Sequence, residues 1–177
     1  FLFRLPKVFL SRLENSELVP SILDWYSKKE DAEYRKTIRK ANRESGKLIR
    51  DRKFINCNSR RTAEKELWIF EGDSAAGGFR KGRNPQTQAA YQMRGVPMNT
   101  IKMNPVDIMK NEVFSDIINI TGLKWGKKNE MKNLNFGKFV IASDMDFDGH
   151  KIAALLLVFF NHFPELFSQR MVCRIIS

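Results

Sequence analysis

Four acidic side chains could form a site for chemistry in this sequence. Asp144, Asp146 and Asp148 alternate with other residues in the stretch DMDFDG, which Gly149 completes. Glu71 directly follows a separate apolar stretch, ELWIF. Carboxylates this close repel one another unless a cation is present, and hard oxygen ligands suit Mg²⁺. The acids therefore predict a Mg²⁺ site that could stabilise charge on an oxygen of a phosphodiester.

Two other interpretations of the aspartates compete with metal binding. An EF-hand calcium loop also reads D-x-D-x-D-G, but it needs a bidentate Glu at position twelve, which here is Leu155. The second interpretation is an acidic turn that caps the following helix. Asp148 lies beside the expected helix start, so capping explains it as well as metal binding does. Capping alone does not account for Asp144 and Asp146, so both roles stay open for this segment.

Alternating strands and helices are expected from about residue 66 onward, and these elements would position the acids. Apolar stretches typical of buried strands lie at residues 66–70, 89–96, 138–143 and 170–176. Helices are expected at residues 104–122 and 150–162. This order is typical of an α/β domain with a mostly parallel sheet. Ligands of such sheets bind at the carboxyl ends of the strands, so Glu71 should meet the aspartates if their strands are neighbours.

The helix expected at residues 104–122 has signals at both ends. Asn104 can cap it, Pro105 suits the first helical position, and Asp107 favours the first turn. Gly122 is a typical stop. We therefore expect one continuous helix over this range.

A basic helix is expected in the first part of the chain. Ser27 and Glu30 have the spacing of a capping box at its start. Its apolar stripe would consist of Tyr34, Ile38, Ala41 and Leu48. The charged face would be solvated or would lie near DNA phosphates.

Composition limits the classes of function. The 177 residues are 42% hydrophobic and carry a formal net charge of +11, which favours a packed domain with an anionic partner. Nucleic acid, an anionic membrane surface and a merely solvated basic face all remain open. Cys57 and Cys173 lack metal-ligand spacing, which predicts no disulfide framework and a reducing, intracellular setting. The longest apolar run, residues 152–160, is too short to span a bilayer, and a chain that begins with Phe1 is expected to be a piece of a longer protein.

Two further kinds of site are not supported. The stretch EGDSAAGGF (71–79) contains neither the Walker A pattern nor the G-x-G-x-x-G pattern of nucleotide-binding loops. Ser74 lies outside a G-x-S-x-G elbow and is distant in sequence from His150 and His162, so a serine hydrolase is not expected.

Six short motifs occur in one order and together resemble a known family. They are EGDSAAGGF (71–79), GR (82–83), QA (88–89), RG (94–95), Asn99 and DMDFDG (144–149). This set resembles the Toprim domain of type IIA DNA topoisomerases, the module of the gyrase B subunit and its eukaryotic and phage relatives. The resemblance implies a Rossmann-like Toprim domain at residues 54–177. It also implies that residues 1–53 are the end of a transducer domain and its linker helix.

The resemblance implies a mechanism for this domain. A tyrosine on another domain or subunit attacks the DNA backbone, while the Toprim acids hold Mg²⁺. The implied metal residues are Glu71, Asp144, Asp146 and Asp148. The first three are also the implied catalytic residues, with Glu71 in proton transfer. The implied function is the DNA cleavage and religation half-site of an ATP-dependent type II DNA topoisomerase, whose ATP is bound by an upstream domain outside this chain.

The resemblance also implies partners. These are double-stranded DNA and the subunit or domain with the cleavage tyrosine, in a dimeric or heterotetrameric assembly in the cytoplasm, away from membranes. The implied DNA-binding residues are Arg80, Lys81, Arg83 and Arg94.

The sequence departs from the family pattern at two positions. Val96 stands where the family has a lysine, and Lys151 stands where it has a histidine. Such divergence would suit a phage or viral enzyme. The alternatives are another Toprim enzyme, such as a primase or a nuclease, and a non-enzymatic DNA-binding module whose acids only cap a helix or bind a structural ion.

Overall fold

The structure is a computed structural model that describes residues 18–44 and 53–175. The chain divides after Arg39 into two compact units, and each is described by itself. The boundary predicted between residues 53 and 54 lies within the second unit and stays a prediction.

Helix α2, Leu18–Glu44, begins earlier than the sequence predicted. Ser27 lies inside this helix, so the predicted capping box at Ser27 is wrong. The helix extends toward its start through Pro20, which falls in the first turn, where a proline is tolerated. Ion pairs one turn apart support its surface, such as Lys28 Nζ with Asp24 Oδ2 at 2.7 Å.

The predicted apolar stripe of this helix is not a buried face in the structure. Tyr34 is 42% exposed, and Ile38 is half-buried. Leu48 lies outside the described residues, as does the side-chain environment of Ala41.

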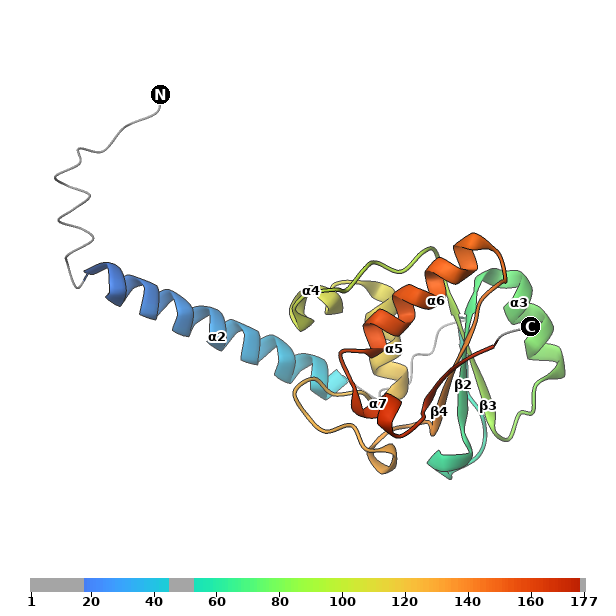
Figure 1. The fold of residues 1–177 in the computed structure, drawn as a ribbon. Coiled ribbons are helices and arrows are strands. Elements are labelled where there is room, and N and C mark those ends of the chain that lie inside the picture. The colour runs from blue at the N-terminus through green and yellow to red at the C-terminus, as the bar shows by residue number, and fades with distance from the viewer. Residues whose placement is uncertain (1–17, 45–52, 176–177) are drawn as a thin grey trace. The chain divides into compact units, whose positions relative to one another are not determined.

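A five-stranded sheet forms the centre of the second unit (Figure 1). Its strands are β1 (Phe54–Ile55), β2 (Glu66–Glu71), β3 (Gln88–Met93), β4 (Lys138–Ala142) and β5 (Val172–Arg174). Their order is β1-β3-β2-β4-β5, and only β1, at one edge, pairs antiparallel. The expected α/β fold with a mostly parallel sheet is therefore confirmed, and β1 is a strand that the sequence did not predict.

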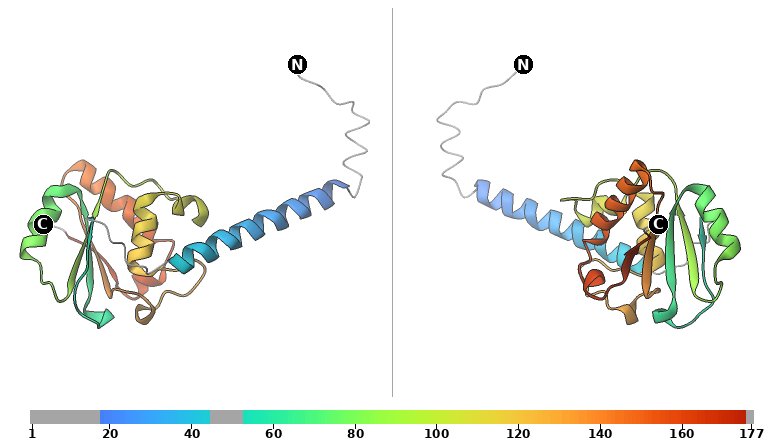
Figure 2. Two further views of the ribbon diagram at one scale, coloured as in Figure 1. Left: turned by 180° about the vertical axis from the view of Figure 1, so that it is seen from behind. Right: turned by 45° about the vertical axis from the view of Figure 1, so that its right-hand side comes forward.

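Helices cover both faces of this sheet (Figure 2). On one face lies α3 (Gly72–Gly82), whose Phe79 packs on Trp68 and Phe70 with ring centroids 4.7 and 4.8 Å apart. On the other face lie α5 (Glu112–Thr121) and α6 (Phe147–Phe160). There, Phe139 of β4 stacks on Phe160 of α6 at 5.6 Å. The short helix α7 (Glu165–Ser168) then leads into β5.

The segment 104–122 forms two helices instead of the single one predicted. Helix α4 (Pro105–Met109) starts as expected, with Asn104 accepting a hydrogen bond from the Asp107 amide. A second cap, Asn111, then accepts a hydrogen bond from the Phe114 amide and starts α5. Helix α5 ends as predicted at Gly122, which adopts φ 82°. The prediction of one helix was wrong because asparagine favours capping over a helix interior.

Replacing Asn111 with alanine should reduce the free energy of unfolding by about 0.5–2 kcal/mol, the usual cost of losing a helix cap. The side-chain acceptor for the Phe114 amide, 3.3 Å away, would disappear. Urea unfolding would measure the change, with the exposed Asn133 changed to alanine as the matched control. Equal losses in both variants would contradict the capping role.

No helix of the described residues combines the length and the apolar character that a membrane crossing needs.

Candidate functional site

The two acid-bearing segments meet at one edge of the sheet. Strands β2 and β4 are parallel neighbours, with Glu66 opposite Lys138 and Phe70 opposite Ala142. From β2 the chain crosses to β3 on one side, whereas from β4 it crosses to β5 on the other side. The carboxyl ends of β2 and β4 therefore form a topological switch point, the position where open α/β sheets bind ligands.

Glu71 ends β2 and lies on the face of the sheet that carries α6. Side chains alternate along a strand, so Glu71 shares a face with the buried Leu67 and Ile69. Gly72 follows and is the first residue of α3. Its φ of 77° lies in the left-handed region, which a residue with a side chain would adopt only with strain. The Glu71 carboxylate is thus held at the strand end, next to the start of α6.

The environment of Glu71 disfavours the charged form of its carboxyl. Burial is the largest cause of a raised pKa for this carboxyl, and the charges of Asp144, Asp146 and Asp148 raise the pKa further. One carboxylate oxygen, Oε2, is buried and has no hydrogen-bond partner. The condition for the expected meeting, that the strands ending in Glu71 and in the acid loop are neighbours, is confirmed by the pairing of β2 with β4.

The acid loop, residues 144–149, is held by its own hydrogen bonds. Asp146 is the N-cap of α6, and its Oδ1 accepts a hydrogen bond from the Gly149 amide at 2.7 Å. The Nδ1 of His150 lies 2.6 Å from the Asp146 carbonyl oxygen. The capping role considered for Asp148 is therefore filled by Asp146, and Asp148 is exposed in the first helical turn.

Among the described residues, no three or more His, Cys, Asp or Glu side chains gather closely enough to hold a metal ion by themselves. The side chain of Asp73 is outside the described set. Ser143, which immediately precedes the acid loop, has a buried hydroxyl without a hydrogen-bond partner. Sequence reasoning missed Ser143 because a single serine at a strand end carries no distinctive signal.

The four predicted DNA-binding residues fall into two groups. Arg80 Nη2 donates a hydrogen bond to Gln92 Oε1 at 3.2 Å, and Arg83 Nη1 donates to the Gln88 carbonyl oxygen. These two half-buried arginines therefore contact β3 of their own domain. Lys81 and Arg94 are exposed, and Arg94 directly follows Met93, which pairs with Glu71 in the sheet.

The two histidines contact backbone atoms. His150 contacts the start of α6, as described above, and the Nε2 of His162 lies 3.0 Å from the Thr100 carbonyl oxygen. Both cysteines are free.

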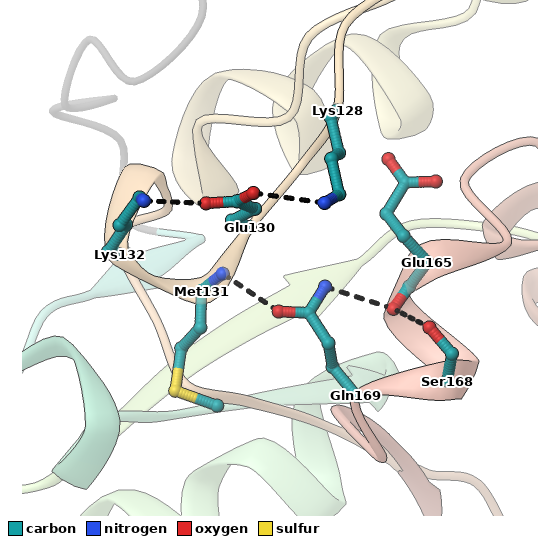
Figure 3. Close-up of a pocket in the computed structure, with 7 residues that line it drawn as sticks. All are labelled: Lys128, Glu130, Met131, Lys132, Glu165, Ser168 and Gln169. Carbon is teal, nitrogen blue, oxygen red and sulfur yellow. Dashed lines mark hydrogen bonds and ion pairs between the residues drawn. The ribbon is translucent and has the colours of Figure 1, made fainter.

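A surface pocket of about 470 Å³ is lined by none of the four acids of this site (Figure 3). It lies between the segment preceding β4 and helix α7, and is lined by Lys128, Glu130, Met131, Lys132, Glu165, Ser168 and Gln169. Glu130 pairs with Lys128 and Lys132 at 3.1 and 2.8 Å, while Gln169 accepts a hydrogen bond from the Met131 amide. The polar groups of this pocket are thus largely satisfied by one another.

Comparison with known proteins identifies the domain. Residues 66–176 match the Toprim domain family. The chain is 41% identical over 108 residues to the B subunit of DNA topoisomerase 4 from Mycoplasma capricolum, covering 60% of this chain and 17% of that protein. It is 35% identical over 163 residues to the B subunit of DNA gyrase from Thermotoga maritima, covering 89% of this chain and 26% of that protein.

A solved structure has the same fold. The DNA-binding, cleavage and re-ligation domain of Plasmodium falciparum topoisomerase II superimposes with a TM-score of 0.66 and 25% sequence identity, covering 74% of this chain and 19% of that one. These comparisons give no support to a phage source. The chain therefore belongs to the Toprim domain family, in the form found in the B subunits of DNA topoisomerase 4 and of DNA gyrase.

Proposed function

We propose that this chain supplies the Mg²⁺-binding half of the DNA cleavage and religation site of an ATP-dependent type II topoisomerase. The observation that carries the proposal is the buried, unpartnered oxygen of Glu71 beside three aspartates. A buried carboxylate without a partner is costly, and a bound cation removes that cost. The proposed metal residues are Glu71, Asp144, Asp146 and Asp148, of which the first three are also the proposed catalytic residues.

The donor set fits Mg²⁺. This ion keeps several waters and is usually bound by one or two carboxylates together with substrate phosphates. Among the described residues no three acids surround a single point, so the protein would supply only part of the coordination shell, as is usual for Mg²⁺. When bound there, Mg²⁺ would stabilise negative charge on the oxygens of the DNA phosphodiester.

The nucleophile must come from elsewhere. Tyr91 is fully buried, and its hydroxyl donates a hydrogen bond to Asp116 Oδ2 at 2.9 Å, so it cannot reach DNA. Tyr26 and Tyr34 are on α2 and do not lie in the family's cleavage-tyrosine context. We propose that a second domain or subunit carries the tyrosine, in a dimeric or heterotetrameric cytoplasmic assembly, and that ATP is bound by an upstream domain outside this chain.

The exposed basic residues would bring DNA to the acids. Lys81 and Arg94 are free to meet phosphates at the surface, whereas Arg80 and Arg83 would act mainly by holding α3 against β3. A formal net charge of +11 would further speed the encounter with double-stranded DNA.

The alternatives have less support. A primase, a nuclease or a non-enzymatic binding module would share the acids, but the relatives described above are topoisomerase subunits over this region.

The test is the Mg²⁺ dependence of cleavage by the full-length protein assembled with its tyrosine-bearing partner. Asp146→Asn removes a charge from the acid loop but keeps a good helix cap, so folding should be preserved. We expect the Mg²⁺ concentration for half-maximal cleavage of a supercoiled plasmid to rise about 10-fold or more.

Asp107→Asn is the matched control, because Asp107 is also close to a helix N-terminus but pairs with Lys110, away from the acid loop. It should leave the Mg²⁺ dependence unchanged. An unchanged Mg²⁺ dependence in Asp146→Asn, or cleavage without a tyrosine-bearing partner, would overturn the proposed function.

A further inference from the structure

Phe147 is the most exposed large hydrophobic side chain among those the structure describes, at 84%. The other described phenylalanines are buried or half-buried, apart from Phe167 on α7 at 39%. Removing a phenyl ring from water lowers the free energy, so a ring this exposed would be stabilised by contact with a partner.

The ring stands within the acid loop. Phe147 is the first residue of α6, between the cap Asp146 and Asp148. Consecutive Cα atoms are about 3.8 Å apart. A molecule bound at the carboxylates of Asp146 or Asp148 would therefore lie close to the backbone that carries this ring.

The backbone under the ring cannot easily rearrange to bury it. The Gly149 amide donates to the Asp146 side chain at 2.7 Å, and His150 contacts the Asp146 carbonyl oxygen at 2.6 Å. The Asp144 backbone fills the space where a Cβ of residue 149 would lie. The loop therefore presents the ring outward from a fixed position.

Other exposed apolar side chains follow the ends of the same parallel strands. Met145, in the acid loop, is 46% exposed, and Val96, three residues after β3, is 53% exposed. Carboxylates and apolar groups thus alternate where DNA would approach. The acids can reach a phosphate only through a cation, whereas apolar side chains suit deoxyribose and base surfaces.

We propose that Phe147 packs against the base next to the phosphate at the acid loop and thereby biases which DNA sequences are cleaved. This inference rests on the proposed function. Contact of an aromatic side chain with a base does not neutralise phosphate charge, so it should affect site preference and leave the requirement for Mg²⁺ unchanged.

The first experiment locates the ring. Phe147→p-benzoylphenylalanine is introduced into the full-length protein, mixed with its tyrosine-bearing partner and a duplex, and irradiated without Mg²⁺, so that the readout does not depend on cleavage. We expect a cross-link to DNA, and none from Phe167→p-benzoylphenylalanine on α7. A cross-link from position 147 only to the partner subunit would overturn the inference.

The second experiment measures preference. A pool of duplexes with randomised bases around the cut is cleaved with Mg²⁺, and the ends are sequenced. Phe147→Ala should reduce cleavage at preferred sites by about 5-fold or more and flatten the base preference beside the cut. Phe147→Tyr should retain the preference, and Phe167→Ala should match the unaltered protein.

The outcomes separate the two proposals. An unchanged cleavage pattern in Phe147→Ala would overturn the inference while leaving the proposed function intact. A raised Mg²⁺ requirement with an unchanged pattern would overturn it too, because it would assign the residue to the metal site. Failure of the unaltered protein to cleave DNA with Mg²⁺ would overturn the proposed function and the inference together.

Discussion

Replacing Glu71 with glutamine should raise the thermal stability of the metal-free protein and at the same time strongly slow its Mg²⁺-dependent DNA cleavage. The amide has the shape of the carboxylate but no charge. It removes the burial cost and the repulsion from Asp144, Asp146 and Asp148 that raise the pKa of Glu71. The same change removes a proposed metal ligand and proton-transfer group, whose loss should slow cleavage about 10²–10⁴-fold.

The stability gain should depend on pH in a definite direction. Because the pKa of Glu71 is higher in the folded protein than in the unfolded chain, the folded state holds this proton more strongly. The unaltered protein should therefore lose stability relative to Glu71→Gln as the pH rises from about 4, the unfolded value for Glu, through the raised folded pKa. Thermal unfolding in EDTA across this range measures the difference.

Glu66→Gln is the matched control, because Glu66 lies at the opposite end of the same strand. Its carboxylate already accepts hydrogen bonds from Trp68 Nε1 at 2.9 Å and Gln88 Nε2 at 3.1 Å, so its replacement should bring no stability gain. Added Mg²⁺ should stabilise the unaltered protein and not Glu71→Gln. Full cleavage by Glu71→Gln, or an unchanged unfolding midpoint in EDTA, would contradict the assignment of Glu71.

The sequence was sufficient to place the acids at one edge. Strands β2 and β4 are apolar stretches that end in acids, and parallel strands bring such ends together. The sequence did not show whether β2 and β4 are neighbours in the sheet, because β3 lies between them in the chain although not in the sheet. That order depends on the packing of α3 on one face and α5 and α6 on the other, which no local pattern specifies.

The local features that could not be predicted were decided by tertiary contacts. All three aspartates of the acid loop are plausible caps by type, but Asp146 is the cap, and Gly149, whose amide it accepts, packs closely against the Asp144 backbone. Arg80 and Arg83 count equally with Lys81 in a net charge, but these two arginines turn toward β3. The direction of a long side chain depends on neighbours that are distant in sequence.

Gly149→Ala should damage the site through the backbone. An added Cβ would overlap with the Asp144 carbonyl oxygen and lie 2.8 Å from its carbonyl carbon and 2.9 Å from its amide nitrogen. These are backbone atoms, so the start of α6 or the end of β4 would have to move. We expect a loss of about 1–3 kcal/mol in the free energy of unfolding, as for overpacked interiors.

Gly78→Ala provides the contrast for this substitution. Gly78 lies in α3 with nothing within 4 Å of an added Cβ, so alanine should be neutral or stabilise the helix by up to about 1 kcal/mol. Urea unfolding of both variants compares the same added methyl group in two environments. Equal stability changes would show that the Asp144 contact does not constrain the loop.

The cleavage assay separates the position of the acids from general stability. At a temperature where Gly149→Ala is fully folded, its Mg²⁺ requirement should still be raised, because Asp144 and Asp146 are displaced from Glu71 when the loop moves. A folded Gly149→Ala protein with normal Mg²⁺ dependence would mean that the acids tolerate displacement. The close approach at Gly149 would then serve the start of α6 alone and not the carboxylates.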